Sequence, residues 1–103
     1  MKKAVITSYA RTPVGAFLGS LKEVPVETLA ATAIEEAVKR SGIDKASVEE
    51  VIMGHVISST DAPDLARDAA LLCGMVDTPA FTVNRICGSG LQAVASALQE
   101  IQT

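Results

Sequence analysis

The feature that most constrains the fold of this chain is the alternation of short apolar runs with longer stretches of helical periodicity. Three runs of strand length are rich in β-branched residues, at positions 4–9, 51–58 and 80–86. Helical patterns separate and follow them. Strands that are joined by helices pair in parallel through right-handed crossovers. The sequence therefore predicts an α/β fold with three β-α units and a parallel sheet.

The first helix is predicted between Pro25 and Gly42, because Gly42 supplies a left-handed stop and basic residues fill the last turn. Its apolar positions keep a period of 3.6 residues and form one stripe: Val26, Leu29, Ala30, Ala33, Ile34, Ala37 and Val38. Further along the chain, the Ser-x-x-Glu pattern at 47–50 has the form of a capping box and predicts a brief helical turn.

Two further helices follow the second and third strands. Asp61 or Asp64 is expected to cap the second helix, and Gly74 to end it, with a buried side made of Leu65, Ala66, Ala69, Leu72 and Cys73. The third helix starts after Gly90, and its apolar positions are Leu91, Val94, Ala95, Leu98 and Ile101. It is still in phase at Ile101, two residues before the last residue. We therefore expect residues 1–103 to be one incomplete domain.

Composition excludes several classes of protein. The chain has 9 Lys and Arg against 12 Asp and Glu, a net charge of −3. That balance argues against electrostatic binding of nucleic acid. No apolar run approaches the roughly 18 residues that span a bilayer, and the N-terminus lacks a signal-peptide pattern, so we expect a cytoplasmic protein without membrane contact. With two cysteines and one histidine, we expect free thiols and no structural metal.

The segment Asn84-Arg85-Ile86-Cys87-Gly88-Ser89-Gly90-Leu91 carries the most chemical information. It places Cys87 between a strand and a helix, where ligands bind in open parallel sheets. The first helical turn favours the thiolate, which is the nucleophile, and the backbone N–H of Cys87 is a candidate oxyanion donor. Gly88 and Gly90 keep side chains away from a substrate. A lone free cysteine is, however, commonly a small buried hydrophobe.

A phosphate-binding turn is a weaker interpretation of the same segment. Gly88-Ser89-Gly90 lacks the third glycine of G-x-G-x-x-G, because Ala93 occupies that place. The segment also forms the third strand–helix turn of the chain, whereas the dinucleotide fingerprint lies at the first.

Residues 84–94 resemble the nucleophile segment of the thiolases, specifically of the acetyl-CoA acetyltransferases. The similarity extends over the whole chain. Residues 10–15 (Ala-Arg-Thr-Pro-Val-Gly) resemble the opening strand and loop of that family, residues 51–56 its second strand, and residues 66–70 its alanine-arginine helix. Several motifs in register make the resemblance specific.

The resemblance implies that Cys87 takes up an acyl group as a thioester. Thiolases use CoA thioesters as substrates and no bound cofactor. They join two acetyl-CoA molecules by Claisen condensation, or cleave 3-ketoacyl-CoA, and they form dimers or tetramers. Their Gly-His-Pro and Cys-x-Gly motifs lie further downstream and do not occur in these 103 residues. We therefore expect little or no turnover from this chain alone.

The remaining candidates are expected to be structural. His55 reads as a strand residue and Cys73 as a packing residue. Arg67 and Asp68 are expected to contact solvent or an interface, and Arg11 to be solvated. Two alternatives stay open: a ketoacyl-synthase-like condensing enzyme, which also carries a cysteine at a helix start, and a non-catalytic fragment that self-associates through the strand at 81–85.

Overall fold

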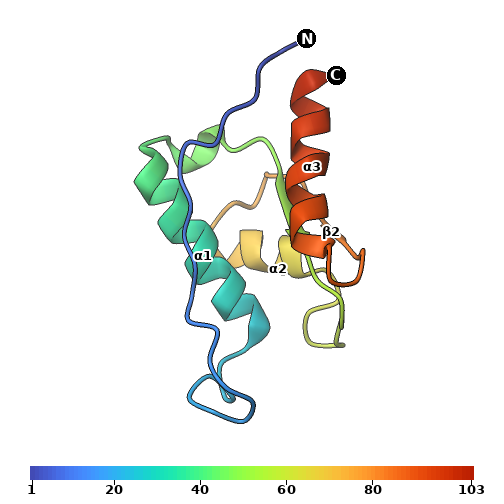
Figure 1. Cartoon of the computed structure of the whole chain (residues 1–103). Helices are drawn as coiled ribbons and strands as arrows, with labels where there is room; N and C mark the ends of the chain where they lie inside the picture. The colour runs from blue at the N-terminus through green and yellow to red at the C-terminus, as the bar shows by residue number, and fades with distance from the viewer.

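The computed structural model describes all residues, 1–103, and has a mixed α/β architecture (Figure 1). This confirms the predicted fold class. The elements in chain order are α1 Val26–Ser41, the 3-10 turn η1 Lys45–Ser47, β1 Val51–Gly54, α2 Leu65–Leu72, β2 Ala80–Val83 and α3 Ser89–Gln102. None of the three α-helices combines the length and the apolar character that a membrane-spanning helix requires.

The sheet consists of two parallel strands joined by α2. Val51 lies opposite Ala80, and Gly54 lies opposite Val83, so the register is unbroken over four residue pairs. Both α2 and α3 contact the strands, while α1 packs on α2. Figure 1 shows α1 and α2 to one side of the strands and α3 to the other. The expected crossover arrangement is thus present, although with fewer strands than predicted.

The strand predicted at 4–9 is wrong, and with it the expected set of three β-α units. This segment is extended but pairs with neither strand, because β1 and β2 pair only with each other. It runs beside α1 instead (Figure 1). The Ser8 hydroxyl donates a hydrogen bond of 2.6 Å to the carbonyl of Ala37, and the Arg40 guanidinium donates one of 3.1 Å to the carbonyl of Tyr9. A β-branched run becomes a strand only where a ladder partner is available.

The helix predicted between Pro25 and Gly42 is confirmed, because α1 starts directly after Pro25 and ends at Gly42. Gly42 has a φ of 74°, which is the expected left-handed stop. The capping box at 47–50 is wrong. The turn lies earlier, at Lys45–Ser47, and the Asp44 carboxylate caps it by accepting a 3.1 Å hydrogen bond from the Ala46 N–H.

The second helix begins after Asp64, one of the two predicted caps, whose carboxylate accepts hydrogen bonds from the Arg67 N–H at 3.4 Å and from the Thr82 hydroxyl at 2.5 Å. Its buried face is made almost wholly of alanine. Leu72 is exposed, contrary to the prediction, and Ala70 is buried in its place. The residues that form the core around α2 are Ala30, Val51, Ala62, Leu65, Ala66, Ala69, Ala70, Cys73 and Met75.

The third helix is present, but most of its predicted apolar stripe is exposed. The exposed fractions are 76% for Leu91, 54% for Val94, 40% for Leu98 and 46% for Ile101. Ala93 faces inward instead and is buried. The helical period was read correctly, because it depends only on local spacing. Burial needs a neighbouring element on that side, and none of the other elements covers it.

The start of α3 packs closely against the end of β1 at Gly54. A Cβ built on Gly54, the last residue of β1, would lie 2.5 Å from the carbonyl oxygen of Ser89 and 2.6 Å from the nitrogen of Gly90. Real side chains do not tolerate such distances from backbone atoms. The absence of a side chain at Gly54 is therefore what allows the first turn of α3 to rest on the end of β1.

Replacing Gly54 with alanine is expected to lower the free energy of unfolding by about 1–3 kcal/mol, the usual cost of overpacking. The matched control is Gly90→Ala, because a Cβ at Gly90 would meet nothing within 4 Å. That change is expected to be neutral or to stabilise α3 by up to about 1 kcal/mol through helix propensity. Urea unfolding followed by circular dichroism measures both. Equal stability of the two variants would contradict the packing role of Gly54.

Candidate functional site

The turn between β2 and α3 brings Cys87 to the surface. Cys87 follows the carboxyl end of β2 by four residues and precedes Gly88, the N-cap of α3. Its thiol is free and exposed. The structure thus places Cys87 at the predicted strand–helix junction. The alternative interpretation of Cys87 as a buried hydrophobic residue is wrong, because its thiol is exposed.

The residue before Cys87 has an uncommon backbone conformation. Ile86 has a φ of 49°, in the left-handed region that β-branched residues rarely adopt. Such outliers persist only where surrounding contacts determine them, and they cluster at functional sites. Sequence reasoning did not predict this conformation, because left-handed residues are normally glycine, asparagine or aspartate.

Two side chains of the turn hold Ile86. The Asn84 side-chain oxygen accepts a 3.0 Å hydrogen bond from the Ile86 N–H, and its amide donates to the Val56 carbonyl at 3.2 Å. The Ser89 hydroxyl donates to the Ile86 carbonyl at 2.6 Å and accepts from the Arg85 N–H at 2.7 Å. Ser89 is 4% exposed, so this hydroxyl is almost fully shielded from water.

The backbone donors of the turn divide into two groups. The N–H groups of Gly88 and Ser89 donate to the carbonyls of Arg85 and Ile86, at 3.1 Å each. The N–H groups of Cys87, Gly90 and Leu91 donate no hydrogen bond to any carbonyl or side chain. Free N–H groups at a helix start attract an anion. The turn therefore offers a thiol and unengaged donors on one short segment.

The two glycines after Cys87 leave open space. A Cβ at Gly90 would meet nothing within 4 Å, and one at Gly88 would make only an ordinary 3.5 Å contact with the Arg85 carbonyl. The Arg85 guanidinium itself donates a hydrogen bond to the side-chain oxygen of Gln92 and thereby lies along α3. Within this chain the approach to the turn is unobstructed at the glycines.

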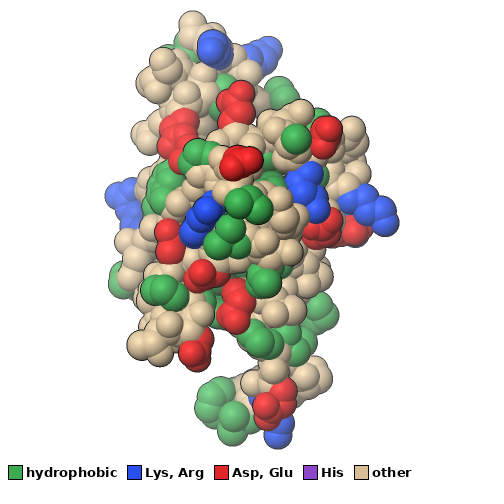
Figure 2. Space-filling view, turned by 180° about the vertical axis from the view of Figure 1, so that it is seen from behind, with side chains coloured by type: hydrophobic (Ala, Val, Ile, Leu, Met, Phe, Trp, Pro, Cys, Tyr) green, Lys and Arg blue, Asp and Glu red, His purple; other side chains and the backbone are tan.

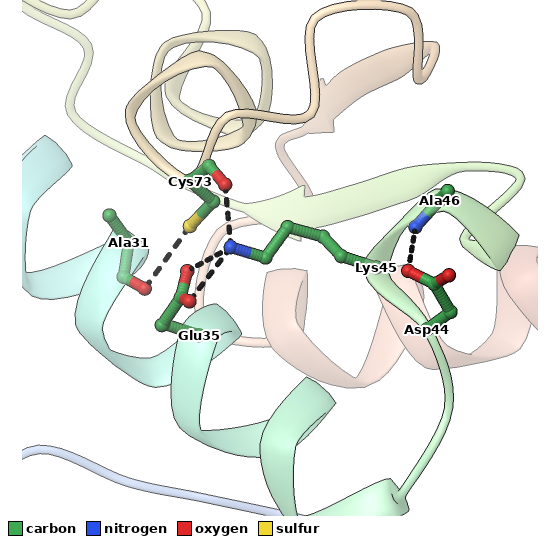
Figure 3. A network of polar contacts seen from close by, with 6 residues as sticks. All are labelled: Ala31, Glu35, Asp44, Lys45, Ala46 and Cys73. Carbon is green, nitrogen blue, oxygen red and sulfur yellow. Dashed lines mark hydrogen bonds and ion pairs between the residues drawn. The ribbon is translucent and has the colours of Figure 1, made fainter.

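Cys73, the second thiol, lies in a different environment (Figure 3). It is 6% exposed at the end of α2, and its Sγ lies 3.4 Å from the Ala31 carbonyl, to which it donates. Burial, together with the nearby Glu35 carboxylate, raises the pKa of the Cys73 thiol. Cys73 is therefore a packing residue, as the sequence suggested.

Lys45 links three elements next to Cys73. Its ammonium contacts both carboxylate oxygens of Glu35, at 2.8 and 2.9 Å, and the Cys73 carbonyl at 2.8 Å (Figure 3). The hydrogen bond from Lys45 holds the pKa of Glu35 below its usual range. This network joins α1, η1 and the end of α2, and it could not be predicted from the sequence because its members are distant along the chain.

His55 and Arg67 also have defined positions. The backbone N–H of His55 donates to the Val83 carbonyl at 3.0 Å and extends the ladder, while its side-chain Nδ1 is buried without a partner. Arg67, which was expected to contact solvent or an interface, is partly buried and forms hydrogen bonds within the chain. Its guanidinium donates to the carbonyls of Val76 and Thr78, at 3.1 Å each, and so fastens the loop before β2 to α2. The sequence did not indicate these bonds, because they depend on the loop after α2 folding back to within reach of the guanidinium.

Asp68 and Arg11 complete the set of predicted residues. Asp68 lies in the first turn of α2, where one carboxylate oxygen is buried without a hydrogen-bond partner. Arg11 is exposed and donates only to the adjacent Thr12 carbonyl, at 3.1 Å. No group of three or more His, Cys, Asp or Glu side chains has the geometry of a metal site.

Two open hollows on the surface lie away from Cys87. One, of about 560 Å³, lies between the loop before α1 and the loop after β1, and the other, of about 440 Å³, lies beside the N-terminal segment. Figure 2 shows the molecule from behind, with apolar side chains scattered among acidic and basic ones. Neither hollow brings a second reactive group to the thiol.

Comparison with known proteins identifies the family. A profile described as "Thiolase, N-terminal domain" matches residues 4–103. The chain belongs to the thiolase family. A probable acetyl-CoA acyltransferase of Staphylococcus aureus is 42% identical over all of this chain, and an acetyl-CoA acetyltransferase of Paracoccus denitrificans is 43% identical over 98% of it. This thiolase chain spans 26% of the length of each.

Solved structures agree with this assignment. The crystal structure of the Bacillus anthracis acetyl-CoA acetyltransferase matches 95% of this thiolase chain with a TM-score of 0.89 and 49% identity. The Ascaris suum Acat5 thiolase, solved in complex with coenzyme A, matches 94% with a TM-score of 0.90 and 30% identity. The matches cover 25% and 26% of those chains. The resemblance that the motifs indicated is thereby confirmed.

The different surroundings of the two thiols predict selective alkylation. At pH 7, iodoacetamide is expected to modify Cys87 at least about tenfold faster than Cys73, because only an accessible thiolate reacts and Cys73 must first be uncovered by a local opening. Peptide mass spectrometry over a time course measures both rates. In urea the two rates should converge, which provides the control. Equal rates in the folded protein would contradict the assigned environments.

Proposed function

We propose that this chain provides the nucleophilic part of a thiolase-type acyltransferase, with Cys87 as the nucleophile. The observation that carries the proposal is the exposed Cys87 thiol on a strained turn, where the N–H groups of Cys87, Gly90 and Leu91 are unengaged. In the first step the thiolate attacks the carbonyl carbon of acetyl-CoA. The tetrahedral oxyanion then collapses, the CoA thiolate leaves, and the acetyl group remains on Cys87 as a thioester.

The Cys87 N–H is the proposed donor to the oxyanion. A hydrogen bond to the developing negative charge lowers the barrier only if the donor is already oriented and free. Both conditions are compatible with the geometry, because this N–H donates to no other group. The open approach at Gly88 and Gly90 further supports attack by a substrate at this turn.

In the second step the acyl group passes to a second acyl-CoA. The carbanion of that molecule attacks the thioester carbonyl, the carbon–carbon bond forms, and Cys87 leaves as a thiolate. The reverse direction cleaves a 3-ketoacyl-CoA. Carbanion formation requires a base, and the single histidine of this chain, His55, has its Nδ1 buried. We propose that the 103 residues alone carry out acyl uptake but not the complete cycle.

A ketoacyl-synthase-like enzyme is the competing acyltransferase. It would take its acyl group from a carrier protein rather than from free acyl-CoA. The relatives named acetyl-CoA acyltransferase and the thiolase solved with coenzyme A favour the CoA thioester as the donor. Acetyl-CoA is therefore the substrate with which the proposal is tested.

Incubation with acetyl-CoA is expected to place one acetyl group on Cys87 and to release one equivalent of CoA, without further turnover. Intact and peptide mass spectrometry locate the acetyl group, and a thiol reagent in a parallel sample quantifies the released CoA. The Cys87→Ala variant should remain unmodified, whereas Cys73→Ala should behave as the parent protein. Acetylation that persists in Cys87→Ala, or release of many equivalents of CoA from the parent, would overturn this assignment.

Self-association is a second candidate property. The outer edge of β2 has no strand partner, and the exposed apolar side chains of α3 (Leu91, Val94, Leu98 and Ile101) lie on one helix. An unpaired edge strand is a template for another chain. Both features favour association of like chains, with the strand that leads to Cys87 at the contact.

Sedimentation equilibrium is expected to show dimers or larger assemblies that dissociate on dilution. Val94→Glu combined with Leu98→Glu should shift the equilibrium toward monomer, because the charges would have to be desolvated at the contact. Glutamate substitutions at Thr28 and Thr32, which are exposed on α1, serve as the control for added charge. A monomer at all concentrations would refute self-association.

A further inference from the structure

The hydrogen bonds of Asn84 and Ser89 act on both peptide groups that flank Ile86. Asn84 binds the N–H of the peptide that joins Arg85 to Ile86, at 3.0 Å. Ser89 binds the carbonyl of the peptide that joins Ile86 to Cys87, through its hydroxyl at 2.6 Å and its backbone N–H at 3.1 Å. Neither peptide can therefore rotate without losing a hydrogen bond.

The orientation of the second peptide determines where the Cys87 N–H points. A trans peptide is planar, and its N–H and carbonyl point in opposite directions. All peptide bonds of the chain are trans. Because Ser89 draws the Ile86 carbonyl toward the start of α3, the Cys87 N–H is directed away from Ser89, and it donates to no other group.

We propose that Ser89 and Asn84 are positioning residues that hold the Cys87 N–H in the orientation needed to stabilise an oxyanion. This inference rests on the proposed role of Cys87 as an acyl acceptor. Ser89 fixes the peptide plane directly. Asn84 acts one peptide earlier, by keeping Ile86 in its left-handed conformation with a φ of 49°.

The strain at Ile86 is what makes these contacts necessary. A β-branched residue in the left-handed region relaxes toward negative φ when its restraints are removed. Relaxation requires rotation of a flanking peptide, and rotation of the one between Ile86 and Cys87 would turn the N–H away and present a carbonyl oxygen in its place. A carbonyl oxygen repels an oxyanion, so the acyl transfer step would slow while the thiol itself stays exposed.

Two reactions of the same thiol separate this effect from a general loss of reactivity. Iodoacetamide alkylates the thiolate by displacement of iodide, and no oxyanion forms. p-Nitrophenyl acetate acylates it through a tetrahedral oxyanion: the thiolate attacks the ester carbonyl, the acetyl–sulfur bond forms, and p-nitrophenolate leaves with the electron pair of the broken carbon–oxygen bond. The ratio of the two rate constants at Cys87 reports the oxyanion donor and is independent of the thiolate fraction.

The ratio of acylation to alkylation is expected to fall at least about tenfold in Ser89→Ala and in Asn84→Ala, since loss of an oxyanion donor costs roughly 10²–10³ in rate. Asn84→Asp keeps an oxygen that accepts from the Ile86 N–H and should restore most of the ratio. Ser96→Ala is the matched control: Ser96 lies two turns further along α3, accepts from the Gln92 side chain at 3.1 Å, and should leave the ratio unchanged.

Unchanged ratios in both Ser89→Ala and Asn84→Ala would overturn the inference. If Ser89→Ala proves to be unfolded by circular dichroism, the decision rests on Asn84→Ala and Asn84→Asp, because Asn84 is exposed and its replacement removes no core packing. Failure of acetyl-CoA to acetylate Cys87, with the expected change in the p-nitrophenyl acetate ratio, would reject the proposed function and keep the positioning role.

Discussion

Contact between the backbone of Gly54 and the first turn of α3 is the constraint on which the geometry of the site depends. β1 is tied to β2 by the parallel ladder, and α3 is tied to β1 by this close approach. The turn from Asn84 to Ser89 connects the end of β2 with the start of α3, and these contacts hold both in place. With both ends fixed, six residues have few ways to connect them, and a left-handed residue is one of the devices that allow a tight connection.

The turn compensates for its own strain. Its side chains, rather than a neighbouring element, satisfy the polar groups of Ile86, and the buried Ser89 hydroxyl both accepts and donates within the turn. Buried hydroxyl groups are costly unless they are paired, so this pairing also stabilises the junction. The backbone of Cys87 remains outside the hydrogen-bonded set, and this leaves its donor available.

Periodicity was sufficient to predict the three helices, because an apolar period of 3.6 residues and a stop such as Gly42 are local properties of the chain. Strands were predicted less well. Residues 4–9 have the right composition for a strand but find no strand partner, and the Ser8 hydroxyl and the Tyr9 carbonyl form hydrogen bonds with α1 instead. The location of Cys87 at a strand–helix junction could be predicted, because an apolar run of strand length precedes it and a helical pattern follows it. The roles of Asn84 and Ser89 did not follow, because they depend on the backbone angle of Ile86, which its residue type disfavours.

The alanine face of α2 has a consequence for how this domain tolerates change. Ala66, Ala69 and Ala70 have no accessible surface, and they belong to apolar clusters that also contain Val51 of β1 and Ala30 of α1. A larger side chain at any of these positions would overpack the contacts of α2 with α1 and with the strands. Substitutions along α2 are thus tolerated on its outer side, whereas its inner side accepts only residues as small as alanine.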